Sequence, residues 1–148
     1  MKKNIVPFVL GVAALFFTAT NASAHCEIPC GIYDDGMRFE MIFEHITTIE
    51  KSMNQIMALE KKEHHNSNQL IRWVTNKEQH ADKLQEIVSQ YFLTQRIKPS
   101  ASKYNDKLAV LHQMLIAAMK CKQTTDLGHV KKLRELNSKF KALYLAGK

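Results

Sequence analysis

Four residues with metal-binding or acid–base side chains lie close together near the start of the chain. They are His25, Cys26, Cys30 and Tyr33. Imidazole and thiolate groups are common protein ligands for nickel, copper and zinc. If the backbone is cut after Ala24, His25 becomes the first residue, and its free amine joins an imidazole and two thiols within six residues. The pattern therefore predicts a metal-binding hook built on a new N-terminus.

The ligand atoms of this hook favour a planar metal site. The amine of His25, the backbone nitrogen of Cys26 and the two thiolates supply two nitrogens and two sulfurs, and the imidazole of His25 can take an axial position. Pro29 and Gly31 let the chain turn back so that Cys30 can reach the metal. A planar set with a peptide nitrogen suits Ni(II) or Cu(II), whereas zinc prefers a tetrahedral shell of side chains.

The first 24 residues have the pattern of a secretory signal peptide. Lys2 and Lys3 precede an apolar run over residues 5–20, and Ala22-Ser23-Ala24 is a small-residue cleavage site. The alternative is an uncleaved membrane anchor, but the run is short for a span and contains a proline. We expect a signal peptidase or another maturation protease to release a periplasmic or secreted protein without a stable membrane anchor. The same cut would create the free amine of His25.

Removal of the leader leaves a single domain of ordinary size, residues 25–148. Without Lys2 and Lys3, the remaining basic residues still outnumber the 14 acidic ones by five. This moderate positive charge can draw in a small anion. The basic residues are spread along the chain rather than gathered with aromatics on one face, so we expect no nucleic-acid binding.

Apolar residues past the hook recur at steps of three and four, which is the period of an amphipathic helix. Asp34-Asp35-Gly36 indicates a turn and a helix start, and this helix ends near the polar cluster at residues 61–68. Its apolar face comprises Phe39, Ile42, Ile46, Ile49, Met53 and Ile56. A second helix is predicted from about Ser67 to about Arg96, where Pro99 follows it. Its apolar face comprises Leu70, Trp73, Val74, Ala81, Leu84, Ile87, Val88 and Tyr91.

Two further helices complete the prediction. The face of the third comprises Tyr104, Leu108, Leu111, Leu115 and Ala118, and a turn with a cap follows at residues 123–126. The face of the fourth comprises Val130, Leu133, Leu136, Phe140 and either Leu143 or Tyr144. No strand-like alternation is present, so we predict an all-α protein, an antiparallel four-helix bundle with an N-terminal metal-binding hook at residues 25–33.

The hook resembles a known family of enzymes. His25, Cys26, Pro29, Cys30, Gly31 and Tyr33 match the H-C-x-x-P-C-G-x-Y signature of nickel superoxide dismutases. The likeness continues through Arg38-Phe39-Glu40 and from Trp73 to Pro99. The resemblance implies a nickel cofactor that cycles between Ni(II) and Ni(III), superoxide as the substrate, dioxygen and hydrogen peroxide as products, and assembly as a homohexamer.

The resemblance also implies roles for residues around the metal. Tyr33 would be a gate beside the open nickel face and Tyr91 a second tyrosine near the site, although both could simply be packed tyrosines. Glu40 would accept a hydrogen bond from the axial His25 ring, against the alternative of a solvated charge. The family can place an arginine behind that glutamate, where this chain has His80. That histidine either replaces the arginine or is a satisfied buried residue.

Two other functions use the same residues. The hook could belong to an exported nickel or copper carrier without turnover, or Cys26 and Cys30 could form a thiol–disulfide module or a plain disulfide. The spacing C-x-x-x-C and the lack of a βαβ pattern speak against the thiol–disulfide module. Cys121 lies in a helical pattern and is expected to be a small packing residue rather than a third ligand.

Overall fold

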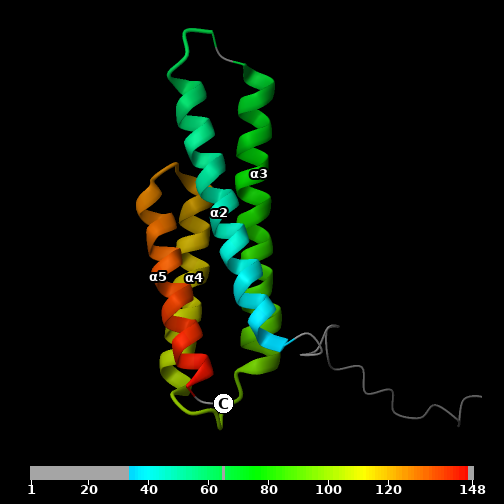
Figure 1. Cartoon of the computed structure of the whole chain (residues 1–148), viewed down its shortest axis with the longest axis vertical. Coiled ribbons are helices and arrows are strands. Elements are labelled where there is room, and N and C mark those ends of the chain that lie inside the picture. Colours follow the sequence, from blue (N-terminus) through cyan, green and yellow to red (C-terminus); the bar gives the residue numbers. More distant parts are fainter. Residues whose placement is uncertain (1–33, 65, 147–148) are drawn as a thin grey trace, which may run out of the picture.

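The computed structural model describes residues 34–64 and 66–146, and within them the chain is entirely helical. The elements are α2 (Asp34–Glu60), α3 (Ser67–Glu86), η1 (Ile87–Arg96), α4 (Tyr104–Gln123) and α5 (Leu127–Leu145). Because η1 continues α3 without a break, the elements form four rods that alternate in direction (Figure 1). The predicted antiparallel four-helix bundle is confirmed, whereas the leader and the hook lie outside the described residues.

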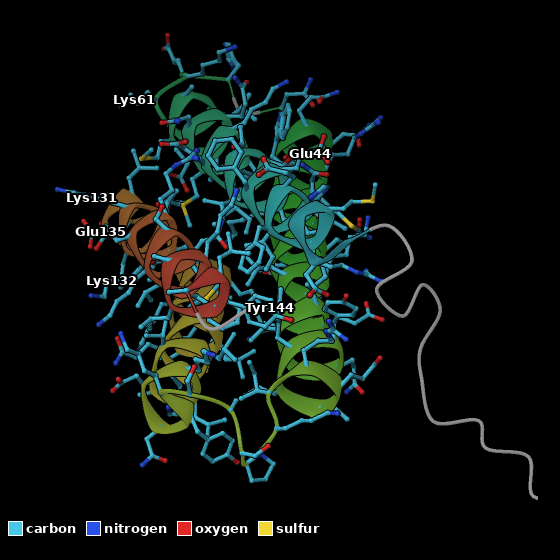
Figure 2. The ribbon with its side chains drawn as sticks, turned by 60° about the horizontal axis from the view of Figure 1, so that its bottom comes forward. Glu44, Lys61, Lys131, Lys132, Glu135 and Tyr144 are labelled. Atoms are coloured by element: carbon cyan, nitrogen blue, oxygen red, sulfur yellow. The ribbon has the colours of Figure 1, made fainter. Side chains whose placement is uncertain are left out.

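The apolar stripes of α2 and α5 form the core as predicted. All six apolar positions expected on the first helix are at most 3% exposed, and those of α5 are equally buried. Of the two alternatives at the end of α5, Tyr144 is buried and Leu143 lies at the edge of the core. Figure 2 shows Lys131, Lys132 and Glu135 on the outer side of α5, away from the core.

The predicted faces of the two middle helices are buried only in part. Leu70, Trp73 and Val74 are half-buried, because α2 and α3 extend beyond α4 and α5 and have no further helix against them there (Figure 1). On α4 the deepest residues include Val110, Met114 and Cys121, none of which was on the predicted face. No helix in the described part of the chain is long and apolar enough to span a membrane.

The second rod differs from the prediction in its last ten residues. Sequence periodicity predicts one α-helix to about Arg96, but residues 87–96 form a π-helix. The backbone N–H of Ile97 donates to the carbonyl of Phe92 at 2.9 Å, five residues back. Such long π segments are rare and often lie at functional sites. The predicted apolar residues of this segment, Ile87, Val88 and Tyr91, are buried all the same, and Phe92, which was not on the predicted face, is buried with them.

The hook joins the bundle at one particular end. The start of α2, the end of η1 and the end of α5 all lie there (Figure 1). The fold therefore brings three elements together at the end of the bundle where the described chain begins.

At the other end of α5, the side chain of Asp126 accepts a hydrogen bond from the N–H of Gly128 at 2.8 Å, which confirms the predicted cap.

Candidate metal centre and its support

The predicted metal ligands lie immediately before the described chain. His25, Cys26, Cys30 and Tyr33 all fall outside the described residues, and the first described residue follows Tyr33 directly. The predictions for their roles therefore remain predictions. What the structure does show is the part of the bundle to which they are attached.

A buried carboxylate in the first turn of α2 collects hydrogen bonds from two other elements. Asp35 is only 1% exposed. Its Oδ1 accepts from the Tyr91 hydroxyl, and its Oδ2 accepts from the Tyr144 hydroxyl and from Nη2 of Arg96, both at 2.8 Å. Nε of Arg96 also donates to the Tyr144 hydroxyl oxygen at 3.2 Å. We call Asp35, Tyr91, Arg96 and Tyr144 the Asp35 network.

The Asp35 network keeps its tyrosines neutral. Burial is the main reason that the pKa of Tyr91 rises to about 12, and the hydrogen bond to the negative Asp35 adds to the effect. Burial likewise raises the pKa of Tyr144. The bonds to Asp35 and Tyr144 raise the pKa of Arg96, which stays charged. A buried carboxylate needs such partners, because an unpaired charge is costly away from water.

Aromatic rings pack directly against this network. Phe39, Phe92 and Phe140 surround Tyr144, with ring centroids 5.5 to 5.8 Å from its ring. The packing fixes the Tyr144 ring and excludes water from one side of the carboxylate. The end of the bundle next to the hook is therefore rigidly built, with polar groups enclosed by apolar ones.

Tyr91 was predicted to stand near the metal, and this stays a prediction because the metal ligands lie outside the described residues. Its ring lies under the guanidinium of Arg38, 4.5 Å from centroid to Cζ. The two side chains line a surface hollow of about 380 Å³ between α2 and α3, together with Met41, His45 and Lys83 among others. The hydroxyl of Tyr91, however, donates its hydrogen bond to Asp35 and not to a group in the hollow.

Glu40 lies on a different side of α2. Arg38 and Glu40 flank the buried Phe39 in sequence, so they are about 200° apart around the helix. While Arg38 covers Tyr91, the carboxylate of Glu40 is exposed and accepts from Nζ of Lys141 on α5 at 2.9 Å. The structure does not bring Glu40 and Tyr91 together, and the role of Glu40 toward His25 stays a prediction.

His80 is half-buried and paired with a residue that sequence reasoning did not single out. Its Nδ1 lies 3.1 Å from Nδ1 of His45 on α2. Arg96 pairs with the buried Asp35, and Arg134 pairs with Glu50. His80 therefore has a partner in His45, while both interpretations of its role remain predictions, because His25 lies outside the described residues.

Sequence patterns did not mark Asp35, Tyr144 or Arg96 as residues of a site. Asp35 was assigned only to a turn and helix start, and Tyr144 only to an apolar face. Arg96 marked the end of a helix. The bonded partners in this network are 48 to 109 positions apart, so no local spacing connects them.

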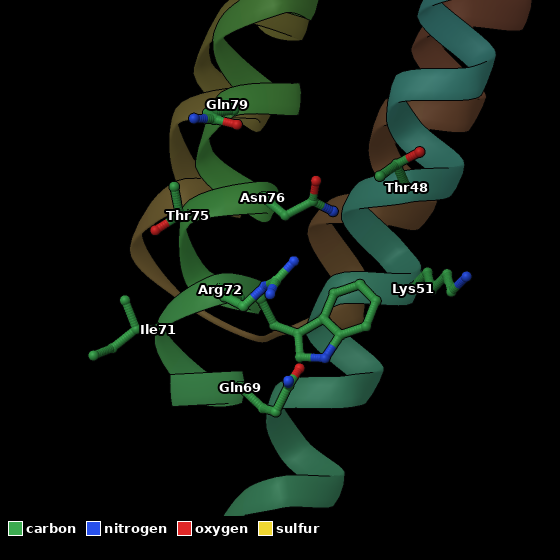
Figure 3. A pocket seen from close by; sticks show the side chains of 9 residues that line it. Thr48, Lys51, Gln69, Ile71, Arg72, Thr75, Asn76 and Gln79 are labelled. Carbon is green, nitrogen blue, oxygen red and sulfur yellow. The ribbon is translucent and has the colours of Figure 1, made fainter. Parts of the chain in front are cut away.

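A larger hollow of about 740 Å³ lies between α2 and α3, in the direction of the loop that joins them (Figure 3). Its walls include Lys51, Arg72 and Trp73, and Asn76 points across it to α2, where it donates to Oγ of Ser52 at 2.9 Å. None of its lining residues is a histidine, cysteine, aspartate or glutamate. It is therefore not a candidate for the nickel site.

Comparison with known proteins identifies one family. A family model described as nickel-containing superoxide dismutase matches residues 20–148. No curated protein and no solved structure gave a match.

Proposed function

The chain belongs to the nickel-containing superoxide dismutase family, and from this we propose that His25, Cys26 and Cys30 hold its nickel while the Asp35 network fixes the hook to the bundle. The enzyme is an oxidoreductase that converts superoxide to dioxygen and hydrogen peroxide. The assignment of ligands and the mode of attachment are the parts proposed here.

The metal-binding side chains among the described residues support this proposal. Residues 34–64 and 66–146 contain no group of three or more His, Cys, Asp or Glu that could hold a metal ion. Their one cysteine, Cys121, is fully buried, and burial raises its pKa to about 11. It cannot serve as an accessible thiolate at neutral pH. The thiolates that a redox-active nickel needs must then come from Cys26 and Cys30, which fit that requirement.

The bound nickel supplies one-electron oxidation of one superoxide and one-electron reduction of another. Formation of hydrogen peroxide also needs two protons. Tyr91 is a poor source, because its proton is held by Asp35 and its pKa is about 12. We assign Tyr91 to positioning the start of α2, and leave water, a thiol or Tyr33 as the proton sources.

The position of Asp35 supports its role as an anchor. It lies two residues after Tyr33, and its bonds reach η1 and α5 at once. The chain leaving the hook is therefore held against the bundle from its second helical residue on. A fixed starting point reduces the conformational freedom of the preceding residues and helps Tyr33 keep one position relative to the metal.

We further propose that proteolysis after Ala24 exports the protein and creates the amine of His25. The support is the leader pattern, with its basic start, apolar run and small residues before the cut. A periplasmic or secreted location follows from this reading. Assembly as a homohexamer is proposed from the family resemblance, and sedimentation of the nickel-loaded protein tests it.

The free amine gives the decisive test. Protein that begins at His25 should bind nickel and remove superoxide, whereas protein with one extra alanine before His25 should lose almost all activity, because its amine is displaced from the metal. Superoxide removal and nickel content are measured on both, with the N-terminus checked by intact mass. Equal activity of the two proteins would contradict the proposal.

The thiolates give a second test with a matched control. Cys26→Ser should abolish activity and the signal of oxidised nickel in electron paramagnetic resonance, because the hydroxyl is a much poorer donor. Cys121→Ala removes a thiol from the core and should leave the nickel signal in place. A Cys26→Ser protein with full activity would rule out the assigned ligand set.

A further inference from the structure

Two histidines from neighbouring helices point at each other between α2 and α3. The Nδ1 atoms of His45 and His80 are 3.1 Å apart. The ring centroids are 5.0 Å apart and the ring planes cross at 72°, so the rings meet edge to edge or edge to face rather than stacking. Two imidazole nitrogens, neither of which belongs to the predicted hook, thus converge on one place.

The distance between these nitrogens suits a shared metal ion. With bonds of about 2.0–2.1 Å, two nitrogens on one ion lie about 2.9 Å apart at a right angle and about 3.4 Å apart at the tetrahedral angle. The observed 3.1 Å falls between these values. The two helices therefore already hold the nitrogens at the spacing that a shared ion needs, and the rings need only turn so that both lone pairs face it.

Without a metal, the same distance is a hydrogen bond in which one ring carries its proton on Nδ1 and donates to the other. An ion that binds both Nδ1 atoms replaces this proton, and the donor ring then carries its proton on Nε2 instead. Both rings stay neutral throughout, so the exchange needs no net loss of a proton.

The surroundings keep the rings neutral and accessible. Burial is the main cause that lowers the pKa of both histidines, and the positive charge of Lys83 lowers them further, while Glu44 opposes the shift. For His45 the charge of His80 also contributes. Neutral imidazole is the form that binds metals. His45 lines the same open hollow as Tyr91, which gives an ion and its waters a way in.

We propose that His45 and His80 bind a divalent transition-metal ion, of the nickel, copper and zinc class, through both Nδ1 atoms with water in the remaining positions. This site differs from the nickel hook in its ligands, which are two imidazoles and no thiolate. With only two protein ligands it holds the ion weakly and exchanges it readily. The charge of Lys83 beside it weakens binding further, since two positive charges repel each other.

Titration of the mature, nickel-saturated enzyme with Zn(II) tests the site directly. Nitrogen shifts of the histidine rings, followed by nuclear magnetic resonance, should show Nδ1 of His45 and His80 moving together as zinc is added. His45→Gln or His80→Gln should weaken zinc binding by about tenfold or more, because each removes one of two ligands. His112→Gln, at an exposed position on α4, is the matched control and should bind zinc as the parent does.

Lys83→Gln keeps both rings and should increase the affinity for zinc. A variant that merely damaged the fold would instead bind zinc more weakly. The inference would be overturned if zinc left the nitrogen shifts of the His45 and His80 rings unchanged. Equal zinc affinity of the parent protein and the His80→Gln variant would also overturn it. These readouts do not use superoxide removal. If the proposed ligand set of the hook is wrong, the amount of nickel bound before zinc is added should show it.

Discussion

At the residue scale, one carboxylate decides how the start of α2 is held. Asp35 is almost completely buried and accepts three hydrogen bonds, from two tyrosines and an arginine. Hydrogen bonds to a charged group are stronger than those between neutral groups. The Asp35 network therefore stabilises the bundle end and adds to the effect of burial in raising the pKa of Tyr91.

Asp35→Asn should lower the pKa of Tyr91 from about 12 toward the ordinary value of about 10. The substitution removes the negative charge that disfavours the phenolate. It should also lower the free energy of unfolding by about 1.5–3 kcal/mol, because charged hydrogen bonds are lost in a buried place. Tyrosinate absorbance against pH measures the pKa, with Tyr91→Phe to identify the transition, and chemical denaturation measures stability.

Asp82→Asn is the matched control for this change. Asp82 is exposed and pairs with Nζ of Lys122 at 2.6 Å, so its loss should alter stability by less than about 1 kcal/mol. It should leave the titration of Tyr91 as it was. An unchanged pKa of Tyr91 in the Asp35→Asn variant would show that Asp35 does not raise it.

At the element scale, the helices are joined by contacts from polar groups as well as by the core. Lys77 on α3 is 4% exposed, yet its Nζ donates to the carbonyls of Lys122 and Thr124 at 2.6 and 3.3 Å. These carbonyls lie at the end of α4, where no intrahelical donor remains. Lys77 thus caps one helix from another and fixes the turn before α5.

Lys77→Met should lower the free energy of unfolding by about 1–3 kcal/mol, because the stem still packs but the carbonyls at the end of α4 lose their donor. Hydrogen exchange should quicken most in the last turn of α4. Lys120→Met, at an exposed position on α4, provides the comparison and should have little effect. Equal stability of the two variants would show that the cap contributes nothing.

At the scale of the whole molecule, the bundle has two different ends. One end gathers the start of α2, η1 and the end of α5 around the Asp35 network. At the other end, α2 and α3 extend alone (Figure 1). Residues of all four rods form one apolar core within the described part of the chain, so we expect the bundle to fold whether or not nickel is bound.

Stability of the whole fold should fall on mild acidification. The folded protein lowers the pKa of His45 and His80 below the ordinary value, so the unfolded chain takes up their protons first. Their contribution is present above about pH 6.5 and is lost as the pH falls below it. The melting temperature of metal-free protein should therefore drop between about pH 6.5 and 5.5.

The double variant His45→Gln with His80→Gln should flatten this dependence, whereas His112→Gln should retain it. The charged residues that act on this pair are Glu44 and Lys83, and neither variant changes them. An unchanged slope in the double variant would assign the acid sensitivity to other groups.

The sequence by itself placed the chain in its family and predicted the four helices and the hook, because each depends on residues close together in the chain. The signature at residues 25–33 is contiguous, and the apolar period of a helix repeats within one turn. A local pattern such as that of Ile42, Ile46 and Ile49 therefore predicts burial correctly.

Only the tertiary structure decided which polar residues meet. Asp35 is separated from Tyr144 by 109 positions, and His45 from His80 by 35. The π-helix over residues 87–96 also belongs to the folded chain, since the α-helical period of the sequence did not predict it. Pairing over such distances depends on how the helices pack and turn about their axes, and the spacing of residues along the chain does not contain that information.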